Sequence, residues 1–207
     1  MIIALSREDC VVEVDKTEKI LAAALKLFLE NGYRGTTMEE IAKTAGVSKQ
    51  TLYSHFGDKE GLFKALVTKV SKQKFNLVWA KPLRGKPEVV LRNLANRIIR
   101  EVSEPEYLDF IHLIVTEVKN YPEFAQLCLT NISKPAISIL TNYLENCRDL
   151  SLEDPEAVAH IFVNSILYHV LTQEKLEAKK VIPIESKRLI NNLIKLIVSS
   201  RELKGCC

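Results

Sequence analysis

The sequence predicts an all-α protein, with an N-terminal three-helix helix-turn-helix domain joined by a long helix to a larger helical domain. Apolar residues recur at the three- and four-residue spacing of helices, with no convincing strand-like alternation and no internal repeat. Five of the seven glycines lie between residues 32 and 61, whereas all seven prolines follow residue 81. We therefore predict an arm at 1–14, a first domain at 15–75 with its motif at 37–56, and a second domain at 76–207.

The first helix is predicted from a capping pair and an apolar row. Asp15 is suited to cap it, with Glu18 at the capping-box position three residues later. Apolar side chains then recur at helical spacing, at Ile20, Ala24, Leu27 and Phe28. Asn31-Gly32 ends this helix. The preceding CVVEV at 10–14 is compatible with an extended segment or a mobile arm.

Glycine turns and polar caps separate the next three helices. Thr36 or Thr37 caps the second helix, with Glu39 or Glu40 at the box position, and the helix runs to Ala45. Gly46 supplies a left-handed turn before Ser48, which caps a third helix that ends near Phe56-Gly57. Asp58 then caps a fourth helix that extends to Trp79 and spans ~33 Å.

The second part of the chain starts its helices with proline. Pro-Glu pairs occur at 87–88, 105–106, 122–123 and 155–156. Proline fits a first turn because its missing N–H has no partner there, and glutamate favours the positive end of the helix dipole. Each pair therefore predicts a helix start, and Pro135 and Pro183 predict two further starts or kinks.

The composition limits the classes of protein to which the chain can belong. The 207 residues are 47% hydrophobic and 27% charged, which is ordinary for a globular protein. No apolar run reaches the ~18 residues of a membrane span, and MIIAL is too short for a signal peptide, so we expect a cytoplasmic protein without a membrane partner. The five cysteines form no CxxC pair, which favours reduced thiols, although Cys206-Cys207 also permits a disulfide between subunits or a redox role.

Positive charge is concentrated in the first domain. Residues 16–75 contain eleven Lys or Arg and six Asp or Glu, a net +5, whereas the rest of the chain carries −2 of the total of +3. Such a segment is typical of a surface that binds a polyanion.

The helix that follows Ser48 has a surface suited to DNA. Leu52 and Phe56 are four residues apart and face inward, while the remaining faces carry donors and acceptors. A helix fits the DNA major groove, where Lys49 can reach guanine O6/N7 and Gln50 can bind adenine with two hydrogen bonds. The alternative is a scaffold, since short helix pairs with glycine turns also occur in proteins that never bind DNA.

Further contacts to DNA are predicted around these two side chains. The Thr51 methyl can touch thymine, and other side chains are better placed for phosphates. The full set of predicted DNA-binding residues is Thr36, Thr37, Ser48, Lys49, Gln50, Thr51, Tyr53, His55 and Lys59.

The stretch TTMEEIAKTAGVSKQTLYSHFGDKEGLF resembles the N-terminal DNA-binding domain of the TetR family of bacterial transcriptional regulators. The pattern T-x-x-x-I-A-x-x-A-G-V-S-x-x-T-L-Y-x-H-F-x-x-K-x-x-L carries the resemblance over residues 17–63. Many relatives have glycine where this chain has Gln50, so their operator preference does not transfer. The stretches TEVKNYPEFAQLC and DPEAVAHIF are similar to the C-terminal domain of the AefR-like subgroup. The resemblance implies a ligand-responsive regulator, a repressor released from a palindromic operator by an effector, and it names no ligand. The aromatic side chains of the second domain suggest a small, mostly apolar or aromatic effector.

The second domain is expected to bind an effector and a second copy of the chain. The surplus of apolar residues in 155–173 and in the last helix predicts a homodimer interface at Phe162, Ile166, Leu189, Leu193 and Ile197, with burial inside one subunit as the alternative. Core positions are likewise the alternative for the pocket candidates, which are Trp79, Tyr107, Phe110, Phe124, Tyr143, Phe162, Tyr168 and His169.

Two other functions fit the sequence less well. An architectural or protein-interaction DNA-binding protein would keep the fold but bind no effector. A small helical enzyme is the remote alternative, because HExxH, P-loop, GxGxxG and G-x-S-x-G motifs are all missing from the sequence. The later histidines show no i, i+4 pairing for a metal, so we expect no enzyme activity, no cofactor and no metal.

Overall fold

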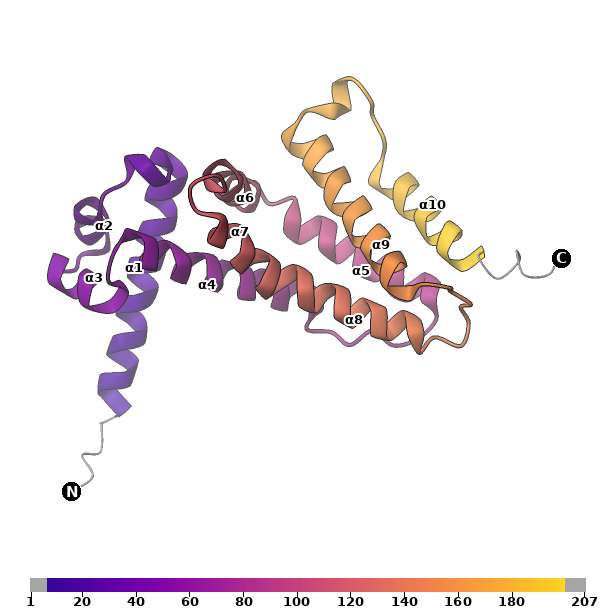
Figure 1. The fold of residues 1–207 in the computed structure, drawn as a ribbon, viewed down its shortest axis with the longest axis horizontal. Coiled ribbons are helices and arrows are strands. Elements are labelled where there is room, and N and C mark those ends of the chain that lie inside the picture. Colours follow the sequence, from indigo (N-terminus) through magenta and orange to yellow (C-terminus); the bar gives the residue numbers. More distant parts are fainter. Residues whose placement is uncertain (1–6, 200–207) are drawn as a thin grey trace. The chain divides into compact units, whose positions relative to one another are not determined.

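A computed structural model describes the backbone of residues 7–199 and the side chains of residues 16–199. Throughout this part of the chain the regular structure is helical, with no strand (Figure 1). The α-helices are α1 (Arg7–Gly35), α2 (Met38–Ala45), α3 (Lys49–Phe56), α4 (Lys59–Trp79), α5 (Pro87–Val102), α6 (Pro105–Glu117), α7 (Pro122–Cys128), α8 (Lys134–Glu145), α9 (Pro155–Val170) and α10 (Ser186–Val198). The all-α prediction is confirmed. Cys206 and Cys207 lie outside the described residues.

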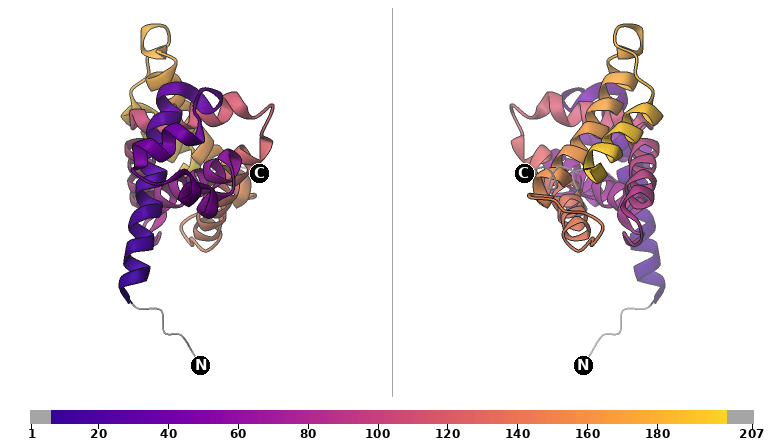
Figure 2. Two further views of the ribbon diagram at one scale, coloured as in Figure 1. Left: turned by 90° about the vertical axis from the view of Figure 1, so that its left-hand side faces the viewer. Right: turned by 90° about the vertical axis from the view of Figure 1, so that its right-hand side faces the viewer.

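Two short π-helical segments and one 3₁₀ turn complete the chain. They are η1 (Leu129–Ser133), which links α7 to α8, η2 (Leu171–Lys175) and η3 (Ala178–Lys180). The last two lie in the connection between α9 and α10, which projects beyond the helices of its own unit (Figures 1 and 2).

The chain forms two compact units. Of the described residues, the first contains 7–70 and 109–128, and the second contains 71–108 and 129–199. The helix α4 begins in the first unit and ends in the second. The sequence suggested one division after residue 75, but the last part of α6 and all of α7 pack with the first unit.

The first helix starts earlier than predicted. It begins at Arg7 and runs through 10–14 and past Asp15, so this segment is neither an extended strand nor an arm, and Asp15 is not its cap. The physical reason is that residues 7–31 contain neither glycine nor proline, so nothing local stops a helix there. Gly32 breaks the helix where predicted, with a left-handed φ of 74°.

The caps of α2 and α3 confirm the sequence prediction. Thr37 caps α2 and forms a complete capping box with Glu40. Gly46 ends α2 in the left-handed conformation, with φ 68°. The Ser48 side chain then accepts a hydrogen bond from the backbone N–H of Thr51 at 3.0 Å. These local signals fix the length of both helices and the turn between them.

Proline marks helix starts as predicted. Four helices, α5, α6, α7 and α9, begin at the proline of a Pro-Glu pair. Pro135 lies in the first turn of α8, and Pro183 precedes α10 in an exposed connection. These residues divide the second half of the chain into its helices.

The second unit has one apolar core built mainly by α5, α8, α9 and α10. Leu94, Leu140, Phe162 and Ile194 are among its buried members, and Trp79 at the end of α4 joins them. Cys147 in the second unit and Cys128 in the first unit are both half-buried.

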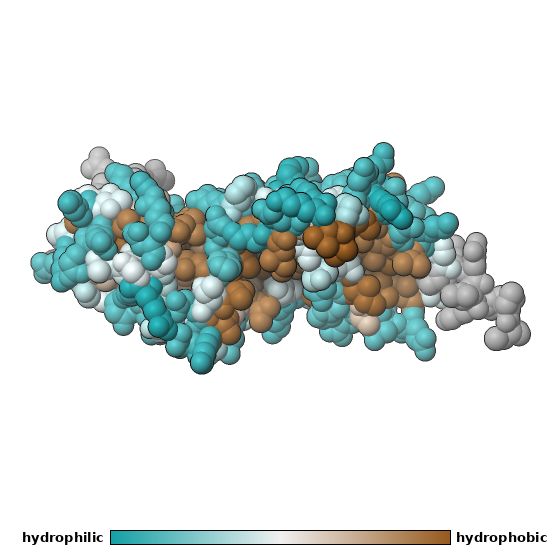
Figure 3. Space-filling model, turned by 90° about the horizontal axis from the view of Figure 1, so that it is seen from above, coloured by the Kyte–Doolittle hydropathy of each residue, from teal (hydrophilic) through white to brown (hydrophobic). Residues whose placement is uncertain are grey.

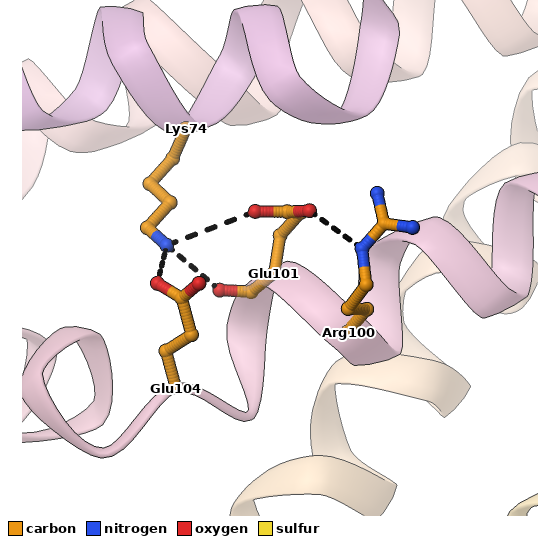
Figure 4. Close-up of polar contacts among 4 residues, drawn as sticks. All are labelled: Lys74, Arg100, Glu101 and Glu104. Atoms are coloured by element: carbon orange, nitrogen blue, oxygen red, sulfur yellow. Dashed lines mark hydrogen bonds and ion pairs between the residues drawn. The ribbon is translucent and has the colours of Figure 1, made fainter.

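A lysine near the end of α4 holds the α5–α6 connection within the second unit (Figure 4). The Lys74 ammonium donates to the Glu101 backbone carbonyl at 3.1 Å and pairs with the Glu104 carboxylate. The Glu101 carboxylate lies 4.0 Å from the same ammonium and accepts a 2.8 Å hydrogen bond from Arg100. Because Lys74 and Glu101 are largely buried, these contacts fix the end of α5 against α4.

Candidate nucleic-acid interface

The core under α2 and α3 orients both helices. Ile41 of α2 and Leu52 of α3 are fully buried, whereas Phe56 at the end of α3 is half-buried. With Leu52 as its anchor, α3 turns its other faces outward. This is the arrangement that a helix needs if it is to enter a groove of DNA.

Most of the predicted DNA contacts share this outer surface. Thr51 is half-buried, and its hydroxyl lies 2.8 Å from that of Ser48. The exposed members are Thr37, Ser48, Lys49, Gln50, Tyr53 and His55. The surface combines a cation, an amide, hydroxyls, an imidazole and a phenol, which are the groups that contact phosphates and base edges.

Lys49 does not project freely from this surface. Its ammonium pairs with the carboxylate of Glu39, in the first turn of α2, and lies 5.6 Å from the centre of the Tyr53 ring. The hydrogen bond to Glu39 raises the pKa of Lys49, and the same bond lowers the pKa of Glu39. Both groups are therefore charged at neutral pH.

Thr36 lies inside the unit and has a structural role. Its side chain is fully buried, and its hydroxyl lies within donating distance of the Gly32 carbonyl at 2.9 Å and the Leu27 carbonyl at 3.0 Å. The hydroxyl therefore ties the end of α1 to the start of α2. Of the two threonines proposed from the sequence, only Thr37 presents its side chain outward.

Lys59 is likewise engaged within the protein. Its ammonium donates to the backbone carbonyls of Tyr33 and Thr36, both at 3.0 Å, and lies 4.7 Å from the centre of the Tyr33 ring. Two of its three donors are thus used at the end of α1. This geometry makes Lys59 a clamp for the segment that leads into α2.

The predicted pocket residues are divided between the two units and between different grooves. Phe110 and Phe124 belong to the first unit, and the other candidates belong to the second. Trp79 and Tyr143 line an open groove of about 760 Å³, and His169 lines a different groove of about 670 Å³. Of the remaining candidates, Tyr107 and Phe162 are buried, and Tyr168 is exposed.

The residues proposed for the dimer interface lie mostly inside their own subunit. Phe162, Ile166, Leu193 and Ile197 are buried in the core of the second unit, and Leu189 is half-buried. The alternative reading of the apolar surplus, burial within one subunit, accounts for these four side chains. The exposed apolar residues of the same helices are others: Ile161, Tyr168 and Leu196.

Sequence reasoning missed the ion pair between Glu39 and Lys49 on the outer surface of α2 and α3. The sequence offers Glu39 only as one of two capping-box candidates, and Glu40 fills that role. Its pairing with a lysine ten residues later depends on how α2 and α3 cross, which no local pattern reports.

The described part of the chain has neither a membrane-spanning helix nor a metal-binding cluster. Within residues 7–199, no helix is long and apolar enough to cross a membrane. Among the side chains that are described, no group of three or more His, Cys, Asp or Glu is arranged to hold a metal ion.

Known families match both parts of the chain. Residues 20–66 match the family model described as bacterial regulatory proteins, tetR family. Residues 89–198 match the model described as AefR-like transcriptional repressor, C-terminal domain.

Two curated relatives are similar over the N-terminal part. The HTH-type transcriptional regulator YhgD of Bacillus subtilis is 42% identical over 62 residues, 30% of this chain and 32% of the relative. QacR of Staphylococcus aureus is 42% identical over 64 residues, 31% of this chain and 34% of the relative. The chain thus spans about a third of the length of these relatives.

Solved structures match over nearly the whole chain. One is described as a TetR-family transcriptional regulator from Mesorhizobium loti, with a TM-score of 0.73 and 25% identity, covering 95% of this chain and 98% of the other. A second is the flavonoid-responsive regulator FrrA, with a TM-score of 0.70 and 27% identity, covering 92% of this chain and 96% of the other.

Proposed function

Because the chain belongs to the TetR family of bacterial regulatory proteins and has an AefR-like C-terminal domain, we propose that it is a DNA-binding transcriptional regulator. We propose further that it is a repressor, released from a near-palindromic operator when a small effector binds. The observation that carries the proposal is the outer surface of α3, which is polar and exposed while Leu52 anchors the helix from behind.

Most of the exposed side chains have a distinct role in this proposal. Lys49 and Gln50 read base edges in the major groove, where a lysine suits guanine and an amide suits adenine. Tyr53 and His55 bind phosphates, which position the protein without reading sequence. The first turn of α2, which Thr37 caps, takes a further phosphate at the positive end of the helix. Lys59 and Thr36 support this surface from within.

DNA binding is tested by titrating the protein with its own upstream intergenic DNA, using fluorescence anisotropy at several salt concentrations. We expect tight, specific binding that weakens with salt, because phosphate contacts release counterions. We expect Tyr53→Ala to weaken operator binding by about tenfold or more, since a hydrogen bond to a charged phosphate is lost.

His112→Ala is the matched control, because it removes an exposed ring of the same unit that belongs to α6 and not to α2 or α3. It should bind as the wild type does. Weak binding of the wild type to every DNA, including fragments from a genome-wide selection, would overturn the proposal. Equal binding by Tyr53→Ala and wild type would remove Tyr53 from the interface.

We propose that the regulator acts as a homodimer through the second unit. Ile161 and Tyr168 of α9 are 57% and 67% exposed, and Leu196 of α10 is 74% exposed. Apolar side chains also gather on the projecting connection, as seen in the space-filling view of Figure 3. They include Leu176, Val181 and Ile182. Exposed apolar side chains in such number are typical of an interface, and a two-fold dimer would place two α3 helices ~34–36 Å apart on DNA.

The dimer is tested by sedimentation of an Ile161→Asp/Leu196→Asp variant. We expect the wild type at twice the 23.5 kDa subunit mass and the variant as a monomer, since two carboxylates would be buried at the interface. The control is Val89→Asp, an equally exposed apolar position on α5 of the same unit. A dimeric double variant would place the interface elsewhere, and a monomeric wild type would contradict the dimer itself.

We propose the effector only by its chemical class, which is small and mostly apolar or aromatic. One of the similar structures is named a flavonoid-responsive regulator, and this name describes that protein and not the present chain. An architectural DNA-binding protein is the competing function. The two differ in one measurement, because a ligand-responsive repressor loses operator affinity when its effector binds and an architectural protein does not. The anisotropy assay is therefore also the screen for ligands.

A further inference from the structure

Glu39 places a negative charge on the surface that we propose binds DNA, itself a polyanion. It lies in the first turn of α2, and its carboxylate pairs with the Lys49 ammonium at the start of α3. Both side chains are exposed, at 57% for Glu39 and 55% for Lys49. The pair therefore sits in solvent on the same surface as Gln50 and Tyr53.

Two neighbouring glutamates in this turn have different roles. Glu40 accepts hydrogen bonds from the Thr37 backbone N–H at 2.9 Å and from the Thr37 hydroxyl at 2.8 Å, so its charge is used in the cap. Glu39 takes no part in the capping box. Its carboxylate is directed across the turn between the helices, toward the cation that we assign to base reading.

The pairing changes what Lys49 can do at different DNA sequences. A lysine ammonium has three donors, so it can keep Glu39 and still donate to guanine O6 or N7. Non-specific DNA is held by phosphates alone. A phosphate that draws Lys49 away leaves the Glu39 carboxylate unpaired beside a polyanion, and like charges repel. The Glu39 carboxylate therefore weakens binding mainly to DNA that offers Lys49 no base contact.

We propose that Glu39 is a positioning residue for sequence specificity, which orients Lys49 toward base edges and disfavours its use on phosphates of non-operator DNA. This inference rests on the proposed DNA-binding function. Helix-dipole stabilisation is the competing explanation for an acidic residue in a first turn. That explanation requires no link between Glu39 and Lys49, so the two differ in a double-mutant cycle.

The test compares Glu39→Gln with wild type on two duplexes of equal length, the selected operator and a shuffled sequence. We expect non-specific affinity to rise about two- to fivefold, in the range of single exposed ion pairs, while operator affinity stays equal or falls. The ratio of the two affinities therefore falls at least twofold. The salt dependence on shuffled DNA should steepen by up to ~0.9 in slope, because Lys49 now binds a phosphate.

Two controls make the result specific to the pair. Glu30→Gln removes the same charge from α1 of the same unit, where Glu30 lies 4.0 Å from Lys26, and it should leave the ratio unchanged. In a Lys49→Met background, Glu39→Gln should no longer change the ratio. Thermal unfolding of each variant checks that the Thr37–Glu40 capping box is intact.

The outcomes separate this inference from the proposed function. If wild type prefers the operator but Glu39→Gln leaves the ratio unchanged, or raises both affinities equally, the role of Glu39 is overturned and DNA binding stands. An equal effect of Glu39→Gln with and without Lys49 also overturns it, in favour of the helix dipole. If wild type shows no preference for any DNA, both proposals fail.

Discussion

Replacing Gly61 by alanine is expected to damage the junction between α3 and α4. Gly61 lies in the first turn of α4, and its backbone N–H donates to the Asp58 side chain at 2.7 Å. A Cβ at this position would lie 2.2 Å from the Phe56 carbonyl oxygen, closer than real Cβ atoms approach. Because that atom is backbone and not the tip of a flexible side chain, the end of α3 or the Asp58 cap must move.

The expected cost is about 1–3 kcal/mol in the free energy of unfolding, as for other overpacked sites. Operator affinity should fall at least tenfold, because a displaced α3 no longer presents its polar face in one geometry. Urea unfolding followed by circular dichroism measures the first effect, and anisotropy titration measures the second.

Gly35→Ala is the matched control for Gly61→Ala. A Cβ at Gly35 would meet only the Asn31 Cβ at 3.6 Å, an ordinary contact. This variant should be neutral or stabilising by about 0.4–1 kcal/mol, because alanine reduces the freedom of the unfolded chain. Equal stability of the two variants would contradict the close approach at Gly61.

Local signals explain why so much of the fold is predictable from the sequence. The cap at Ser48, the turn at Gly46 and the helix starts at proline depend on residues within four positions of one another. Such contacts form in any context that permits a helix. The one local error, at the start of α1, arose because Asp15 fits a cap although nothing forces the helix to begin there.

Contacts between distant residues account for what the sequence did not reveal. Lys59 looks like a phosphate ligand in a one-dimensional pattern, yet its ammonium reaches the carbonyls of Tyr33 and Thr36, 26 and 23 positions away. A Lys59→Ala variant would therefore disturb the support of α2 as well as any DNA contact, which is why Tyr53→Ala is the cleaner test. Likewise, the sequence of α9 does not tell which of its many apolar residues are buried. Only the packed structure shows that Phe162 lies in the core and that Ile161 is exposed.

The packing of residues 109–128 with the first unit is the largest feature absent from the sequence pattern. Phe63 of α4 lies at the centre of an aromatic cluster in this unit and is fully buried. Its ring centre lies 5.0 Å from those of Phe28 and Tyr33 of α1, 6.3 Å from that of Phe110 of α6 and 4.5 Å from that of Phe124 of α7. Burial is the main cause that raises the pKa of Tyr33, with Tyr121 beside it as a further one.

Phe63→Ala is accordingly expected to lower the free energy of unfolding by about 3–5 kcal/mol, since a large buried ring is lost and four aromatic neighbours face the cavity. A loss of this size is a large fraction of the stability of a typical domain, so DNA binding should fail at temperatures where wild type still binds. Far-UV circular dichroism during urea unfolding gives the free energy. Trypsin cleavage within residues 109–128 should accelerate, because α6 and α7 lose their contact with α4.

The single tryptophan allows the damage to be assigned to a unit. Trp79 lies in the core of the second unit, so its fluorescence reports unfolding there. Phe162→Ala removes an equally buried ring from that core and should shift the Trp79 transition directly. Phe63→Ala should instead shift the circular dichroism signal to lower urea than the Trp79 signal. If Phe63→Ala moves only the Trp79 signal, or leaves stability unchanged, the aromatic cluster is not what stabilises the first unit.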